Sequence, residues 1–193
     1  MRLLLAILLL AVSPVPASAE LFFAPFAGVK FGGSTSIFDI EFASGEKKFT
    51  MGAALMDVDA GILGYEASLG YIPGYFERDN RLWNTGSFAI DLAGSVLLAA
   101  PPGLTGGGLR PYAAAGAGLI HVQAADKLNI LQVRRTVPVG NVGVGAIGLF
   151  TNDVGVRFDY RYLRSLTTDD GSLSRVGRRI SYSRFSVGLF LRL

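Results

Sequence analysis

Apolar and polar residues alternate with a period of two along most of the chain. The clearest segment is 154–163, in which large apolar residues share one face and glycine or charged residues share the other. The first set is Val156, Phe158, Tyr160 and Tyr162, and the second is Gly155, Arg157, Asp159 and Arg161. Alternate side chains of a β-strand lie on the same face, so this pattern predicts strands with one apolar face.

Eight segments of this kind follow one another, each bounded by turn residues. They are 21–32, 48–55, 61–76, 82–98, 109–123, 137–150, 154–163 and 184–193. In 61–76 the apolar face is expected to carry Leu63, Tyr65, Leu69, Tyr71 and Tyr75. Within 113–118 alanine and glycine are so frequent that the pattern does not distinguish the two faces.

The connections alternate in length and composition. Short or Pro/Gly-rich links occur at 57–59, 101–108 and 151–153, whereas 33–47, 77–81, 124–132 and 165–178 are longer or more charged. Short turns at one end and longer loops at the other are typical of outer-membrane barrels. The link 77–81 is short for a loop, so it fits this rule imperfectly.

The first nineteen residues have the features of a secretory signal. Arg2 is followed by the apolar run 3–12, and Ala17-Ser18-Ala19 forms a small-residue cleavage site before Glu20. A run of ten residues is too short for a transmembrane helix, which needs about 20. We therefore expect residues 1–19 to be a signal peptide and 20–193 one β-barrel domain, with an uncleaved anchor as the alternative.

The composition agrees with a membrane protein that has no transmembrane helices. Half of the residues are hydrophobic and 17% are charged, against about 25% charged in soluble domains. After residue 20 no apolar run reaches about 18 residues, the length that a helical span requires. The chain has no cysteine and one histidine, which argues against disulfides and most transition-metal sites. We expect no cofactor.

The polar face of the predicted strands decides between a membrane barrel and a soluble one. It carries glycine, alanine and serine with a few charges of both signs, which we expect to pair as a lumen charge network. Its members are Lys30, Glu66, Asp91, Arg157, Asp159, Arg161 and Arg184. In lipid only a closed sheet satisfies all its backbone groups. The prediction is an all-β, eight-stranded antiparallel up-and-down transmembrane β-barrel; the alternative is a soluble periplasmic ligand-binding barrel.

Several segments resemble known outer-membrane proteins. Residues 185–193 resemble the terminal strand that the barrel-assembly machinery reads, with Leu193 in place of the usual final aromatic residue. Residues 64–76, 109–112 and 116–120 resemble members of the outer-membrane β-barrel superfamily, which is similar in architecture to the OmpA and OmpX transmembrane domains. The resemblance implies a location in the bacterial outer membrane. The implied partners are its lipid, its lipopolysaccharide and the assembly machinery.

We find no catalytic arrangement in the sequence. The lipid A deacylases, which resemble this architecture, use a His/Ser pair on the outer face of the barrel. Here no serine follows His121 by two residues, and strand parity places His121 inward. The carboxylate pairs Asp57/Asp59 and Asp169-Asp170 are expected to form solvated turns, with calcium binding or catalysis as the alternative. We expect that the protein is not an enzyme.

Basic and aromatic residues gather near the predicted ends of the strands. Arginine matches phosphate geometry, so Arg175, Arg178 and Arg179 of the last loop are candidate contacts for lipid phosphate; the alternative is a generic charged rim. Nucleic acid is not an expected partner of an exported membrane protein. Two interface girdles are predicted from aromatic residues. They are Phe22, Phe23, Phe26, Tyr71, Tyr75, Phe76, Trp83, Tyr160, Tyr162 and Tyr182.

The sequence therefore predicts a barrel with a structural or surface-interaction role. Eight strands leave an interior that side chains can fill, so a wide channel is not expected. A narrow porin or ion channel is the first alternative function, and a lipid A-modifying enzyme is the second.

Overall fold

The computed structural model describes residues 21–35, 47–58, 61–75, 87–101, 105, 108–125, 132–151, 153–166 and 180–193. It contains eight β-strands and confirms the predicted number. They are β1 (Leu21–Thr35), β2 (Lys48–Asp57), β3 (Leu63–Pro73), β4 (Ser87–Ala99), β5 (Leu109–Ala125), β6 (Gln132–Leu149), β7 (Val154–Ser165) and β8 (Ile180–Arg192). Residues 1–19, the expected signal peptide, lie outside the described residues.

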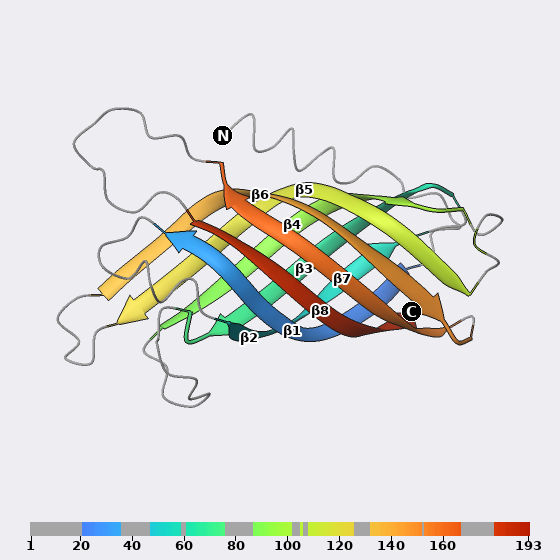
Figure 1. Cartoon of the computed structure of the whole chain (residues 1–193), viewed down its shortest axis with the longest axis horizontal. Helices are drawn as coiled ribbons and strands as arrows, with labels where there is room; N and C mark the ends of the chain where they lie inside the picture. The colour runs from blue at the N-terminus through green and yellow to red at the C-terminus, as the bar shows by residue number, and fades with distance from the viewer. Residues whose placement is uncertain are drawn as a thin grey trace.

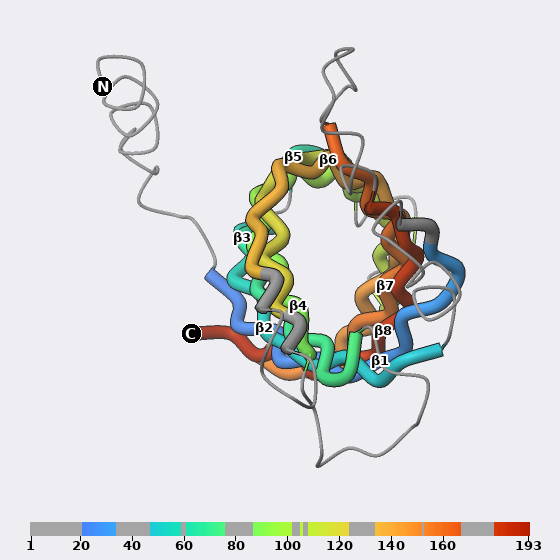
Figure 2. Tube along the Cα trace, turned by 90° about the vertical axis from the view of Figure 1, so that its left-hand side faces the viewer, coloured from blue at the N-terminus to red at the C-terminus, as the bar shows by residue number. Residues whose placement is uncertain are grey.

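The strands form a closed barrel. Each strand pairs antiparallel with the next along the chain, and β8 pairs with β1, which closes the sheet. Figure 1 shows the strands tilted against the long axis, and Figure 2 shows the ring that they form, with β1 beside β8. We call the end with the connections 58–62, 100–108 and 150–153 the turn end, and the opposite end the loop end.

The tilt follows from the register of the ladders. From Phe22 on β1, successive ladder partners on the seven other strands lead back to β1 at Gly33, eleven residues farther along. One of these residues belongs to the bulge between Phe31 and Gly33, where Gly32 has a φ of 53°. A stagger of this size tilts the strands by about 35–45°, as closure of a barrel requires.

Some strand boundaries differ from the prediction. β6 begins at Gln132 rather than at 137, so Arg134 and Arg135, which the prediction assigned to no strand, belong to β6. β4 begins at Ser87 rather than at 82, and β3 ends at Pro73. Residues 76–86, which include the predicted link 77–81, lie outside the described residues.

The predicted faces are correct along most of β4, β7 and β8. In these strands the charged, glycine and small residues turn inward and the large apolar residues turn outward. Leu92, Val144 and Leu189 are each more than half exposed on the outside of the barrel. The outer wall is therefore apolar and the inner wall is mixed.

Four aromatic residues predicted for the outer girdles lie inside the barrel instead. Phe22, Phe26 and Tyr182 occupy inward positions of their strands, and Tyr75 is 0% exposed. Tyr75 follows Gly74, whose φ of 62° ends the alternation of β3 and reverses the expected direction of the next side chain. Phe23, Tyr71, Tyr160 and Tyr162 do face outward, whereas Phe76 and Trp83 lie outside the described residues.

Two apolar clusters fill the ends of the lumen. The turn-end cluster consists of Phe22, Ala24, Ala54, Met56, Val58, Leu97, Ala99, Tyr112, Ala114, Ile147 and Phe190. The loop-end cluster consists of Ile72, Tyr75, Ala89, Ile120, Val122, Val137, Val139, Leu163, Ile180 and Tyr182. In the turn-end cluster the rings of Phe22 and Phe190 stack at 4.1 Å between centroids.

Among the described residues, no helix is long and apolar enough to cross a membrane.

Candidate functional site

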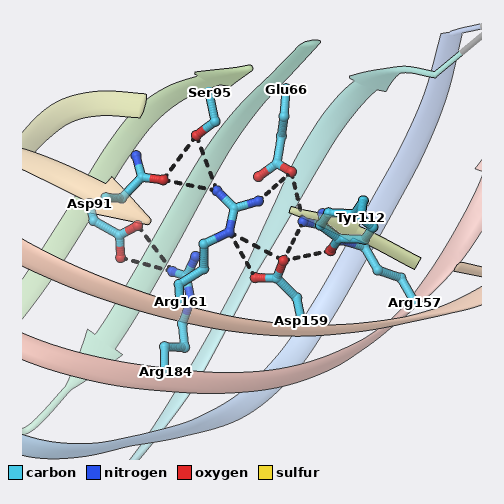
Figure 3. Close-up of polar contacts among 9 residues, drawn as sticks. Glu66, Asp91, Ser95, Tyr112, Arg157, Asp159, Arg161 and Arg184 are labelled. Carbon is cyan, nitrogen blue, oxygen red and sulfur yellow. Dashed lines mark hydrogen bonds and ion pairs between the residues drawn. The ribbon is translucent and has the colours of Figure 1, made fainter. Parts of the chain in front are cut away.

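A layer of ion pairs lies between the two apolar clusters. All seven residues of the predicted lumen charge network are buried, each with at most 5% of its surface exposed. Three arginines and three carboxylates among them contact one another directly, as Figure 3 shows. We call these six the lumen ion network: Glu66, Asp91, Arg157, Asp159, Arg161 and Arg184. Their formal charges cancel.

Glu66 joins β3 to β7 across the lumen. Its Oε2 atom accepts one hydrogen bond from Arg157 Nη2 and another from Arg161 Nη2, both at 2.7 Å. The two arginines are four residues apart and face the same side of β7, which places both side chains within reach of one carboxylate. Such charge-assisted bonds are among the strongest in proteins.

Asp159 lies between the same two arginines on β7. Its Oδ1 accepts from Arg157 Nη2 at 2.9 Å and from the hydroxyl of Tyr112, on β5, at 2.5 Å. Arg161 Nε donates to this carboxylate at 3.2 Å. The Tyr112 hydroxyl in turn accepts from Arg157 Nε at 2.7 Å, so β5 is tied into the network.

The remaining guanidinium nitrogen of Arg161 contacts two neutral groups. Arg161 Nη1 donates to Ser95 Oγ on β4 and to Asn141 Oδ1 on β6, each at 3.1 Å. Our sequence prediction did not include Ser95, Asn141 or Tyr112. They could have been found as polar side chains on the same strand face that carries the charges, because a buried ion needs neutral partners for its remaining donors.

A second ion pair lies nearer the loop end. Arg184 Nη1 on β8 donates to both carboxylate oxygens of Asp91 on β4, at 3.0 and 3.2 Å. The hydroxyl of Tyr182 also donates to Asp91, at 3.2 Å. The Arg184 guanidinium lies 4.8 Å from the ring centroid of Phe26, which gives this inward aromatic residue a cation–π role.

Four cations of the inner wall follow one ladder row. Arg161, Arg184, Lys30 and Lys48 are successive Cα partners on β7, β8, β1 and β2. Like charges in directly paired positions are destabilising, and the carboxylates opposite Arg161 and Arg184 offset this. The ammonium of Lys30 lies 4.7 Å from the ring centroid of Tyr75. Lys48 is 4% exposed and therefore buried.

Glycine makes room for the network on the inner wall. A Cβ on Gly70 would lie 2.3 Å from Asp91 Oδ2 and 2.6 Å from Arg184 Nη1. A Cβ on Gly143 would lie 2.7 Å from Arg161 Cδ, and one on Gly145 would lie 2.3 Å from the Tyr112 hydroxyl. The glycine-rich inner face is therefore shaped around the long polar side chains.

The predicted inward direction of His121 is wrong. His121 lies on the outward face of β5 with Leu119, and its Nδ1 is 2.9 Å from Thr136 Oγ1 on β6. The inward positions next to it are Ile120 and Val122, which belong to the loop-end cluster. The predicted lipid-phosphate contacts Arg175, Arg178 and Arg179 lie outside the described residues.

Side chains fill the space within the lumen ion network. The gap within the network, lined by Phe26, Glu66, Arg157, Asp159, Arg184, Ser186 and Gly188, has no room for a water-sized sphere. Among the described residues, no three His, Cys, Asp or Glu side chains are close enough to hold a metal ion. These ion pairs connect side chains of different strands across the lumen.

Comparison with known proteins identifies the type of barrel. The model of a family described as outer membrane protein beta-barrel domain matches residues 4–192. Among solved structures, neisserial surface protein A has 16% identity and a TM-score of 0.66, covering 91% of this chain and 98% of that one. No curated protein matches the chain.

Two further solved structures share the fold at low sequence identity. The N-terminal β-barrel domain of OprF from Pseudomonas aeruginosa has 15% identity and a TM-score of 0.55, with coverage of 90% and 98%. Ail, the attachment invasion locus protein of Yersinia pestis, has 9% identity and a TM-score of 0.52, with coverage of 91% and 99%. At these identities the likeness concerns the fold alone.

Proposed function

Because the chain belongs to the family of outer membrane protein β-barrel domains, we propose that it serves the bacterial outer membrane as a closed structural barrel. Its filled lumen blocks passage, and its loop end is the part that contacts other molecules. This role requires no cofactor and no catalysis.

The observation that carries the proposal is the neutral lumen ion network between two apolar clusters. A permeating ion would have to shed its water to pass the apolar clusters, which costs far more than thermal energy. It would also have to displace arginine–carboxylate pairs that already contact each other at 2.7–3.0 Å. The packing therefore favours a barrel that holds its shape over one that conducts.

Conductance in planar lipid bilayers tests the sealed lumen. Purified protein should give no stable current steps at voltages where a general porin, inserted under the same conditions, gives clear ones. Stable and reproducible steps from this protein would contradict the proposal and favour a narrow ion channel instead.

The structural role predicts a defect in the outer membrane. Cells that lack the protein should become more permeable to large hydrophobic antibiotics and to detergent, and the wild-type gene should restore the barrier. Normal permeability in the deletion strain, together with an altered set of lipid A species on overexpression, would point to a lipid-modifying enzyme.

We also propose that Arg175, Arg178 and Arg179 contact lipopolysaccharide phosphates. The three residues lie in the connection between β7 and β8 at the loop end, and arginine binds phosphate through a planar fork of donors. Replacing all three with alanine should lower the amount of lipopolysaccharide that co-purifies with the barrel. Unchanged co-purification would contradict this contact.

A further inference from the structure

The outer wall becomes polar near the loop end of β5 and β6. Outward-facing Leu119 on β5 is followed by outward-facing His121 and Gln123. Their ladder partners on β6 are Thr136 and Arg134. Two successive rows of β5 and β6 therefore carry polar side chains on the outer wall, directly beyond the apolar surface.

The hydrogen bond between His121 and Thr136 fixes the imidazole. Nδ1 lies 2.9 Å from Thr136 Oγ1. When the threonine hydroxyl donates to Nδ1, the neutral ring carries its proton on Nε2. His121 then presents an N–H donor away from Thr136, and this hydrogen bond holds the ring in place.

Arg134 and Gln123 extend this set of donors. They face outward as ladder partners, and the arginine is exposed, with no ion pair among the described residues. Within the part of the chain that the structure describes, no carboxylate faces outward at the loop end, since outward-facing Asp57 and the turn residue Asp153 lie at the turn end. Among the described residues, Arg134 therefore contributes a positive charge to the outer wall at the loop end that no carboxylate of the same wall offsets.

The position of these residues along the barrel axis matches the level of the lipid headgroups. His121 lies twelve residues along β5 from Leu109 at the turn end. At a rise of about 3.3 Å per residue and a tilt of about 40°, this corresponds to about 30 Å along the barrel axis. The outward apolar band of such barrels is about 25 Å tall, so His121, Gln123 and Arg134 reach the headgroup level.

We propose that His121, Gln123 and Arg134, with Thr136 orienting the imidazole, form a binding site for the phosphate groups of lipid A in the outer leaflet. The site lies on β5 and β6, apart from the arginines between β7 and β8. It rests on the proposed function for the orientation of the barrel, in which the loop end meets the lipopolysaccharide leaflet. Guanidinium, amide and imidazole N–H groups donate to the phosphate oxygens, and the apolar wall below, with Leu119, Val142 and Val144, packs against the acyl chains.

The single histidine of the chain makes the site directly observable. The protein, purified with an affinity tag that contains no histidine, is placed in nanodiscs with diphosphorylated lipid A or with dephosphorylated lipid A. We expect the imidazole nitrogen signals of His121 to shift only with the phosphorylated lipid. Identical signals in the two preparations would overturn the proposal.

Matched variants separate this site from general charge attraction. Arg134→Ala should weaken binding of phosphorylated lipid A about fivefold, the effect of about one basic residue near an anionic surface, and Thr136→Val should reduce the His121 shift. Lys47→Ala removes an exposed cation elsewhere on the rim and should leave the His121 shift intact. If Arg134→Ala and Lys47→Ala weakened binding of phosphorylated lipid A to the same extent, the proposal of a local site would be overturned.

The outcomes also separate this proposal from the proposed function. A barrel that conducts but still shows the phosphate-dependent shift would contradict the sealed lumen alone. A sealed barrel whose His121 signal ignores phosphate would contradict the β5–β6 site alone. Arg175, Arg178 and Arg179 can be replaced with alanine in the same nanodisc experiment to measure their contact independently.

Discussion

The inner and outer walls of the barrel are made by the same strands but depend on different interactions. On the inner wall, Arg161 contacts groups on β3, β4, β6 and β7, each at a defined distance. On the outer wall, Leu92, Val144 and Leu189 are more than half exposed and face lipid. Each polar side chain of the inner wall needs particular partner groups at defined positions, whereas the side chains of the outer wall need only to be apolar.

The physical reason is the direction dependence of the two kinds of interaction. Ion pairs in a dry interior stabilise the fold only when every donor and acceptor is matched, because an unmatched charge is costly there. Contact with lipid tails is non-directional and depends on apolar area. Equivalent substitutions on the two walls should therefore differ in effect, and the following variants test this difference.

The largest difference is expected at β3. Glu66→Ala removes the carboxylate that Arg157 and Arg161 share, leaving an excess of buried positive charge. We expect a loss of about 3–5 kcal/mol in the free energy of unfolding. Leu69→Ala, on the outward face of the same strand, should cost about 1–2 kcal/mol through lost apolar contact. Urea titration in lipid vesicles, followed by the gel shift of unheated samples, measures both; equal losses would contradict the comparison.

A tyrosine on each wall gives the next test. Tyr112→Phe removes a hydroxyl that donates to Asp159 and accepts from Arg157, so we expect a loss of about 2 kcal/mol. Tyr160→Phe on the outer wall removes one contact, with Ser183 at 3.0 Å, and should cost less than about 1 kcal/mol. The same titration distinguishes the two, and a larger loss in Tyr160→Phe would reverse the proposed order.

The smallest effects are expected at two glycines. Gly70→Ala places a methyl group against Asp91 and Arg184 and should destabilise the barrel by about 1–2 kcal/mol. Gly94→Ala, on the outer wall, meets nothing within 4 Å and should be neutral or stabilise by a few tenths of a kcal/mol through reduced freedom of the unfolded chain. If Gly94→Ala destabilised the barrel as much as Gly70→Ala, the space available for a Cβ would not explain the difference between the two walls.

The alternation of the sequence predicted the barrel and most of its faces because polar and apolar residues separate cleanly in β4, β7 and β8. The same pattern located the charges of the lumen ion network. It did not reveal that Glu66 pairs with arginines 91 and 95 residues away, since such pairing depends on which strands face each other across the lumen.

His121 was assigned to the wrong face in the sequence analysis because the inner wall is apolar at that end of β5. We expected polar residues inside, but Ile120 and Val122 fill the loop-end cluster, which turns His121 outward. The alanine- and glycine-rich stretch before His121 gave no facial pattern that could have corrected the assignment. Tyr75 was misplaced for a different reason, because the positive φ of Gly74 interrupts the alternation.

The ladder between β1 and β8, which closes the barrel, affects the order of the folding steps. Phe23 on β1 pairs with Leu191 on β8, residues 168 positions apart in the chain. Bringing such distant segments together is slow, because the entropy of a long loop must be lost before the contact forms. Closure must therefore be a late step in folding, and until β8 arrives the unfinished sheet has two unpaired edges that can join other chains. The ladder between β1 and β8 is therefore the pairing whose formation removes both unpaired edges.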